Sequence, residues 1–322
     1  MNCRSILGVV TLTMLAGCVA TSAQAQEWPT NPAKIIVAFG PGGTADILGR
    51  ILATELSSAF NQTFYIENKS GNSGAIGSAL VTAAKPDGYT LLIGGAGPLL
   101  VGPAVNPNIT YDTMRDFAHI AIIAGDSNMF AASLTLKVKN FADFLTVARS
   151  RPTACGTSGA GSQGHLVVEL INRKTGSKLQ PVPYRGAAEA MTDLIGGHVQ
   201  CALEPAVSIG EHVIAGEVVG LAVTANQRLS SYKDVPTFAE TGYDIHGTAW
   251  FWLAGPKNMP AAIVARLNQA VRRIVELPKV KEQFTQSAMS TLDLDVAGTR
   301  AFIADEVALW GSTARQVGLK VQ

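Results

Sequence analysis

One stretch of the sequence, residues 35–50, constrains the fold of this chain more than any other. An apolar run (35–39) is followed by a glycine-rich turn (40–43) and then by Thr44, where a helix is expected to begin. The following apolar residues recur at the spacing of one helix face: Ile47, Leu48, Ile51, Leu52 and Leu56. Strand, tight turn and helix in direct succession are typical of an α/β protein.

The glycine turn of this unit has two interpretations. Its glycines leave backbone N–H groups uncovered at the positive end of a helix dipole, which suits a carboxylate or a phosphate. A structural turn without a ligand explains the same residues. We predict Thr44 as the N-cap, and we expect Asp46 to fix the turn rather than touch an anion, because like charges repel. Arg50 and Arg185 are expected to form structural ion pairs.

The same pattern returns at residues 154–171. A short strand at 154–155 leads into a glycine- and hydroxyl-rich segment, and an apolar helix face follows. This second turn offers backbone N–H groups and three hydroxyls, those of Thr157, Ser158 and Ser162. A further glycine turn that contains Ala96 ends another predicted strand. Ligands of parallel α/β sheets bind at the carboxyl ends of strands, which is where these turns lie.

Strands and helices alternate through the chain, which predicts parallel-rich sheets flanked by helices. The predicted strands are 35–39, 63–67, 89–94, 119–124, 154–155, 182–184, 199–203, 220–224, 248–254 and 292–296. After the helix that opens at Thr44 and the one near 166–171, the predicted helices are 75–84, 141–150, 187–195, 209–215, 261–276, 278–287 and 299–316. We predict two lobes, one formed by 27–124 plus 248–322 and the other by the insert 125–247. If the lobes face each other, the two glycine turns converge on one cleft.

The first 26 residues have the pattern of an export signal. Arg4 precedes an apolar run at 6–15, which is too short to span a membrane. Two processing sites compete: a small-x-small site at 23–25, and a lipobox that would leave a lipidated Cys18. Either one predicts an exported, periplasmic protein, with a lipid anchor only in the second case.

Charge and cysteine content exclude several classes of function. The chain has 25 basic and 24 acidic residues, and removal of Arg4 with the export signal leaves 24 of each. The sequence contains no basic run, so nucleic acid is not expected as a partner. Cysteines and histidines show no metal-binding spacing, and no cofactor is expected. Cys155 and Cys201 precede turns in two predicted strands. They form either a disulfide or two buried thiols.

An enzymatic alternative rests on Ser162. Residues 160–164 are one residue away from the Gly-x-Ser-x-Gly nucleophile elbow of α/β-hydrolases, and Asp234 and His246 follow in the required order. However, Ser162 lies seven residues after Cys155, inside a longer glycine loop rather than at the apex of a strand-to-helix turn. No phosphate-loop lysine or dinucleotide fingerprint accompanies the glycine turns.

The segment Phe-Gly-Pro-Gly-Gly-Thr-Ala-Asp at 39–46, together with Arg50, resembles the first motif of the Bug receptors, the periplasmic substrate-binding proteins of tripartite tricarboxylate transporters. The similarity continues through nearly the whole mature chain, at 66–68, Gly71, Gly74, 76–77, 86–91, 156–159, 161–162, 165–166, 182–186, 193–197, 221–224, Arg228, 235–237, Glu240, Gly242 and Trp250. The resemblance implies a two-lobed, Venus-flytrap binding protein without catalysis. It implies a small carboxylate as ligand, held mainly by the two glycine turns, and a membrane permease as partner. A receptor that serves signalling instead of transport stays an alternative, and a monomer is expected.

The sequence departs from the Bug pattern at three places: 69–70, 258–260 and Glu204-Pro205. Only the last faces the expected cleft, and it affects the identity of the ligand. Motif positions and turns together give the candidate ligand-binding residues Gly42, Gly43, Thr44, Asp46, Ala96, Thr157, Ser158, Gly159, Ser162, His165, Glu204 and Trp250. For three of these an alternative stays open: His165 as a structural partner of its loop, Glu204 as a ligand for an amine or a solvated rim residue, and Trp250 as cleft wall or hinge packing.

Overall fold

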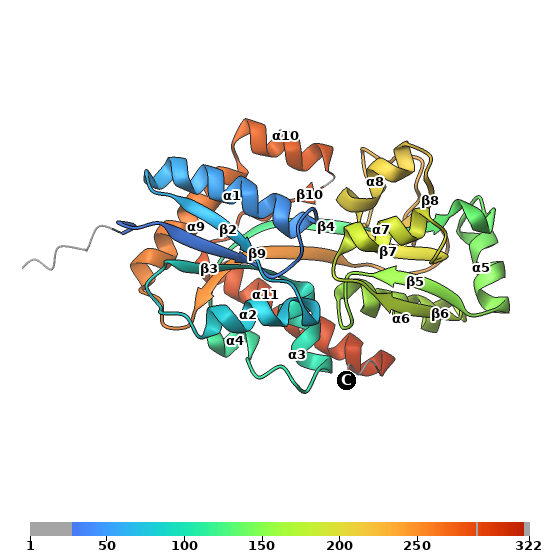
Figure 1. Cartoon of the computed structure of the whole chain (residues 1–322), viewed down its shortest axis with the longest axis horizontal. Coiled ribbons are helices and arrows are strands. Elements are labelled where there is room, and N and C mark those ends of the chain that lie inside the picture. Colours follow the sequence, from blue (N-terminus) through green and yellow to red (C-terminus); the bar gives the residue numbers. More distant parts are fainter. Residues whose placement is uncertain (1–27, 288, 319–322) are drawn as a thin grey trace, which may run out of the picture.

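Two long strands run through the middle of the molecule, and the longer of the two belongs to both of its halves (Figure 1). They are β4 (Phe117–Ser133) and β9 (Thr248–Pro256), which pair antiparallel. The computed structural model describes residues 28–287 and 289–318. The predicted export segment 1–26, with both of its processing sites, therefore lies outside the described residues.

The first lobe is built on a sheet with the strand order β2-β1-β3-β9-β4. β2 (Phe64–Asn68), β1 (Ala33–Val37) and β3 (Thr90–Gly95) are parallel, and β9 is antiparallel to its neighbours. Side chains alternate across this sheet, so that Ile35 and Ile36 enter two different apolar clusters. The flanking elements are α1 (Thr44–Phe60), η1 (Asn72–Gly74), α2 (Ala75–Thr82), η2 (Gly97–Val101), α3 (Gly102–Val105), α4 (Thr113–Asp116), α9 (Ala261–Val275), α10 (Pro278–Gln286), β10 (Met289–Ser290) and α11 (Val296–Val317).

The second lobe uses the C-terminal half of β4 as its central strand. This half pairs antiparallel with β7 (Cys201–Pro205) and with β8 (Val218–Val223). Beyond β7 lie two further strands in parallel, β5 (Thr153–Thr157) and β6 (Leu179–Pro183). The flanking elements are η3 (Leu134–Leu136), α5 (Phe141–Ser150), α6 (Gln163–Thr175), α7 (Ala187–Ile195) and α8 (Ala206–Ile214).

The predicted strand 292–296 is wrong. The structure has a loop over 291–295, a two-residue strand β10 before it, and helix α11 from Val296 with Asp295 as its N-cap. Apolar residues alternate in this segment, as they would in a strand. The backbone is instead held by a side chain, because Asn268 Nδ2 donates to the Leu294 carbonyl at 3.1 Å. The predicted strand 119–124 is too short, since β4 continues to Ser133.

Cys155 and Cys201 are register partners on the neighbouring strands β5 and β7. Both are buried and both are free thiols, so the two-thiol alternative holds in this structure. Burial raises the pKa of the Cys201 thiol, and so does the neighbouring Cys155. Within 28–287 and 289–318, no helix combines the length and apolar character needed to cross a bilayer.

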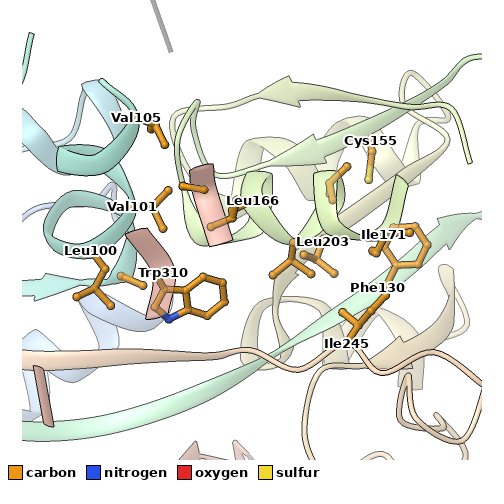
Figure 2. Close-up of a cluster of buried hydrophobic side chains, with 14 of the residues drawn as sticks. Leu100, Val101, Val105, Phe130, Cys155, Leu166, Ile171, Leu203, Ile245 and Trp310 are labelled. Carbon is orange, nitrogen blue, oxygen red and sulfur yellow. The ribbon is translucent and has the colours of Figure 1, made fainter. Parts of the chain in front are cut away.

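An apolar cluster on one side of β4 and β9 connects the two lobes (Figure 2). Trp310 of α11 lies between Val101, which belongs to the first lobe, and Leu166 and Leu203, which belong to the second. The indole is 5% exposed and its Nε1–H donates to Glu306 Oε2 at 2.9 Å. Helix α11 therefore packs against both lobes.

Candidate functional site

A cavity of about 660 Å³, its open mouth included, lies between the lobes. The first lobe contributes the turn after β1, the first residues of α1 and the segment after β3. The second lobe contributes the N-terminal ends of α6, α7 and α8 and the end of β7. The two glycine turns recognised in the sequence therefore meet at one cavity.

The start of α1 presents unpaired backbone donors to this cavity. Gly43 is the N-cap and has no side-chain cap hydrogen bond, so the prediction of Thr44 as N-cap is wrong. The Thr44 hydroxyl is engaged elsewhere, because it donates to Asp126 Oδ2 on β4 at 2.9 Å. In the described chain the amides of Thr44 and Ala45 donate to no protein acceptor. The positive end of α1 is thus open toward the cavity.

Asp46 holds the turn and does not line the cavity. Its carboxylate accepts from the Gly42 amide at 3.2 Å, from Arg50 Nε at 3.0 Å and from Asn68 Nδ2 at 3.0 Å. Burial raises the pKa of Asp46, but the hydrogen bonds from Arg50, Asn68 and Gly42 outweigh it and bring the pKa below the ordinary value. The ion pair expected for Arg50 is confirmed, with Asp46 as its partner.

The start of α6 mirrors that of α1. Ser162 is the N-cap, and its hydroxyl accepts from the His165 amide at 3.1 Å. Among the described residues, the amides of Gln163 and Gly164, the first two of the helix, have no acceptor. Both residues line the cavity. Gly164 brings the helix close to β7, since a Cβ there would lie 2.9 Å from the Leu203 carbonyl oxygen.

His165 supports the loop before α6. Its Nδ1 accepts from the Gly161 amide at 3.1 Å, and burial lowers the pKa of the imidazole. Ser162 is occupied as a helix cap, and His246 pairs with Asp244 at 2.8 Å. The Ser–Asp–His arrangement needed by a hydrolase is therefore not formed by these residues.

Two buried carboxyl groups lie beside the cavity. Glu204, at the end of β7, is 1% exposed and receives a hydrogen bond from the Ser158 hydroxyl at Oε2, while Oε1 has no partner among the described residues. Burial raises the pKa of Glu204 to about 8, although Ser158 lowers it. Burial also raises the pKa of Asp126 to about 7, against the effect of the Thr44 hydroxyl. The solvated-rim alternative for Glu204 is wrong because β4 and β5 enclose its strand.

The structure brings half of the predicted residues to the cavity wall: Gly43, Thr44, Ala96, Ser158, Ser162 and Glu204. The other six lie behind the wall or beside it: Gly42, Asp46, Thr157, Gly159, His165 and Trp250. Gly159 lines an adjacent cavity together with Ser158. Trp250 packs edge-on against Phe302, with ring centroids 5.2 Å apart.

The side chains of the cavity wall that the sequence analysis missed include two aromatic rings and two amides, those of Phe39, Phe251, Asn128 and Gln163. Phe39 and Phe251 form an edge-to-face pair with centroids 6.2 Å apart, and they supply an apolar surface. Asn128 Nδ2 donates to Gln163 Oε1 at 3.3 Å, and Gln163 Nε2 donates to the Thr248 carbonyl at 2.9 Å. Phe39 belongs to the first motif and could have been selected from it. Asn128 lies inside a strand that was predicted to end before it.

Known proteins are similar to this chain in sequence and in structure. The model of the tripartite tricarboxylate transporter family receptor matches residues 48–319. Protein BugT of Bordetella pertussis is 30% identical over 326 residues, covering all of both chains. Rpa4515 of R. palustris, solved with adipate, is 32% identical with a TM-score of 0.88, over 91% of this chain and 99% of that one. MatC from Rhodopseudomonas palustris, solved with bound malate, is 25% identical with a TM-score of 0.84, over 89% of this chain and 99% of that one.

Proposed function

The chain belongs to the tripartite tricarboxylate transporter receptor family, and we propose that it binds a small carboxylate in the cavity between its lobes. The family consists of receptors that bind a solute, so the chain is a binding protein and not an enzyme. One observation carries the proposal: the N-termini of α1 and α6, which belong to different lobes and have unpaired amides in the described chain, line one cavity. Such groups form a site for an anion.

The carboxylate oxygens would accept from the amides of Thr44, Ala45, Gln163 and Gly164, and the ligand's carbon chain would lie on Phe39 and Phe251. The hydroxyls of Ser158 and Ser162, together with Gly43, Ala96 and Glu204, complete the proposed contacts. Gly42, Asp46, Gly159 and His165 would act by shaping the two turns, and Thr157 and Trp250 by packing behind the wall. Adipate and malate, the ligands named for the two R. palustris structures, make dicarboxylates the first class to test.

We also propose that binding closes the two lobes, with 125–247 moving against 27–124 plus 248–322. A carboxylate engages both sets of amides only when the lobes are close together, so it favours the closed arrangement. The closed receptor, a periplasmic monomer, would then deliver the solute to a permease of the tripartite tricarboxylate type. Export through residues 1–26, with or without lipid at Cys18, is part of this proposal.

A thermal-shift screen tests the proposal directly. The purified protein is heated with mono-, di- and tricarboxylates, and with sugars and amines of similar size as controls. A carboxylate at 100 times its Kd should stabilise the folded protein by about 2.7 kcal/mol. The proposal fails if no carboxylate raises the Tm. An esterase activity that Ser162→Ala abolishes would restore the hydrolase alternative.

A further inference from the structure

Glu204 is a polar group that the protein leaves half satisfied. It lies in the cavity wall at the end of β7 and is 1% exposed. Oε2 accepts from the Ser158 hydroxyl, while Oε1 has no partner within 28–287 and 289–318. A buried oxygen without a partner is costly, and it usually marks a position where a ligand completes the contacts.

No cationic side chain pairs with Glu204 in the described chain. The titratable groups on the nearest elements are His119 and Asp126 on β4, Cys155 on β5, His165, Glu169, Arg173 and Lys174 on α6, Glu189 and Asp193 on α7, and Glu211 and His212 on α8. None of these forms a hydrogen bond or an ion pair with Glu204 in the described chain. The exposed Arg185 lines the adjacent cavity with Ser158 instead. The Glu204 wall contains no lysine, arginine or histidine.

We propose that Glu204 binds the ligand as a neutral carboxylic acid and donates its O–H to an oxygen of the ligand carboxylate. The inference rests on the proposed function, because it presumes a carboxylate in this cavity. Since the Ser158 hydroxyl already donates to Oε2, the proton belongs on Oε1, the oxygen without a protein partner. An acid–carboxylate hydrogen bond of this kind is short and strong.

The neighbouring donors decide between a carboxylate and an amine as the group that meets Glu204. Free amides of α1 and α6 favour negative charge in the cavity, and an ionised Glu204 would repel a carboxylate held there. A neutral Glu204 removes this repulsion and adds a donor. Binding should therefore be linked to one proton: the receptor with Glu204 protonated binds, and at high pH the complex must take up a proton from solution.

Titration calorimetry with adipate and malate between pH 6.5 and 9.5 tests the linkage, because both ligands are fully ionised throughout. We expect a constant affinity at the lower end of this range. Above about pH 8, where Glu204 ionises, the affinity should decrease with pH, and the decrease should approach tenfold per pH unit. Pairs of buffers with different ionisation enthalpies should show uptake of about one proton at pH 9.5 and almost none at pH 6.5.

Glu204→Gln keeps a donor at this position and cannot ionise. Its affinity should lie within about threefold of the natural protein at pH 6.5 and should stay constant to pH 9.5. Glu211→Gln, the same change at an exposed residue of α8, should keep the natural pH profile. Ser158→Ala removes the hydrogen bond that lowers the pKa of Glu204, so the midpoint of the decline should move to higher pH whatever the change in affinity. The melting temperature of each variant shows that it is folded.

The outcomes separate this inference from the proposed function. If adipate and malate bind but no proton is taken up, or if Glu204→Gln loses tenfold or more at pH 6.5, Glu204 does not act as a neutral donor and only the inference fails. Affinity that rises with pH and favours aminocarboxylates would instead assign Glu204 to an amine. If no carboxylate in the wider screen binds at any pH, the proposed function itself fails.

Discussion

Asp126 forms one of the polar contacts between the two lobes. It lies on β4 and is fully buried, and its Oδ2 accepts from Thr44 at the start of α1. The amides of Ala206 and Val207, at the start of α8, also lower its pKa. Burial outweighs all three donors and raises the pKa of Asp126 to about 7. The carboxyl group therefore ionises near neutral pH at the junction of both lobes.

From the raised pKa of Asp126 we predict how the free energy of unfolding depends on pH. Between the ordinary value of 3.8 and about 7, the folded protein holds a proton on Asp126 that the unfolded chain has released. Rising pH therefore favours the unfolded chain over this interval, by up to about 1.4 kcal/mol per pH unit from this group. Asp126→Asn removes this contribution. The unfolding free energy of the variant minus that of the natural protein should therefore increase from pH 4.5 to pH 7.5. Urea unfolding at four pH values measures this, and an equal difference at every pH would contradict it.

The sequence predicts backbone sites better than it predicts which side chains point into the cavity. Gly43 and Ser162 could be selected because glycine turns between a strand and a helix expose amides wherever they occur. Trp250 and Phe251 could not be separated, because neighbouring residues of a strand face opposite sides and only the register decides between them. The structure places Phe251 on the cavity and Trp250 against Phe302.

The bounds of a helix or strand were predictable where a residue at its end, such as an N-cap, determines them. Helix α5 was predicted with its observed bounds, and Asn140 caps it by accepting from the Asp143 amide at 2.9 Å. Strand β4 was predicted to end too early, because its residues 125–128 are a glycine and three polar residues. They stay extended because they lie between the lobes, where Gly125 leaves room for the Trp250 ring; a Cβ would come within 2.6 Å of it.

The contact between α6 and β7 determines where the amides of α6 point. Gly164→Ala would place a Cβ 2.9 Å from the Leu203 carbonyl oxygen, so the start of the helix must move away from the strand. We expect a loss of about 1–3 kcal/mol in unfolding free energy. We also expect at least tenfold weaker carboxylate binding, because the amides of Gln163 and Gly164 move with the helix. Urea unfolding and calorimetry measure the two effects.

Gly311→Ala is the matched control for this change. Gly311 lies inside α11, where the nearest atom to an added Cβ is Arg315 Nη1 at 3.5 Å. Alanine favours a helix over glycine by about 1 kcal/mol, so this variant should be slightly more stable and should bind normally. Equal losses in both variants would show that α6 has no special need for glycine.

At the scale of the whole molecule, the lobes are joined by the crossing strands, by side-chain hydrogen bonds and by helix α11. The crossing strands are held together by Thr224, whose hydroxyl accepts from the Asn128 amide at 2.9 Å and donates to the Gly247 carbonyl. Helix α11 adds an apolar connection, because Trp310 belongs to the same buried cluster as Val167 of α6 and lies beside the chain crossing at Gly247. We therefore expect Trp310 to limit how far the lobes separate.

Trp310→Ala tests whether this indole holds the lobes together. Removing a buried tryptophan should cost about 3–5 kcal/mol in unfolding free energy, which chemical denaturation measures. Part of the lost surface joins the lobes, so the variant without ligand should also have a larger radius of gyration in small-angle scattering, and adipate should restore the natural value if it closes the lobes. Leu309→Ala is the control on the same helix, since Leu309 is 55% exposed and should change neither quantity. If Trp310→Ala lowers stability but leaves the radius of gyration unchanged, the indole stabilises the fold without limiting the separation of the lobes.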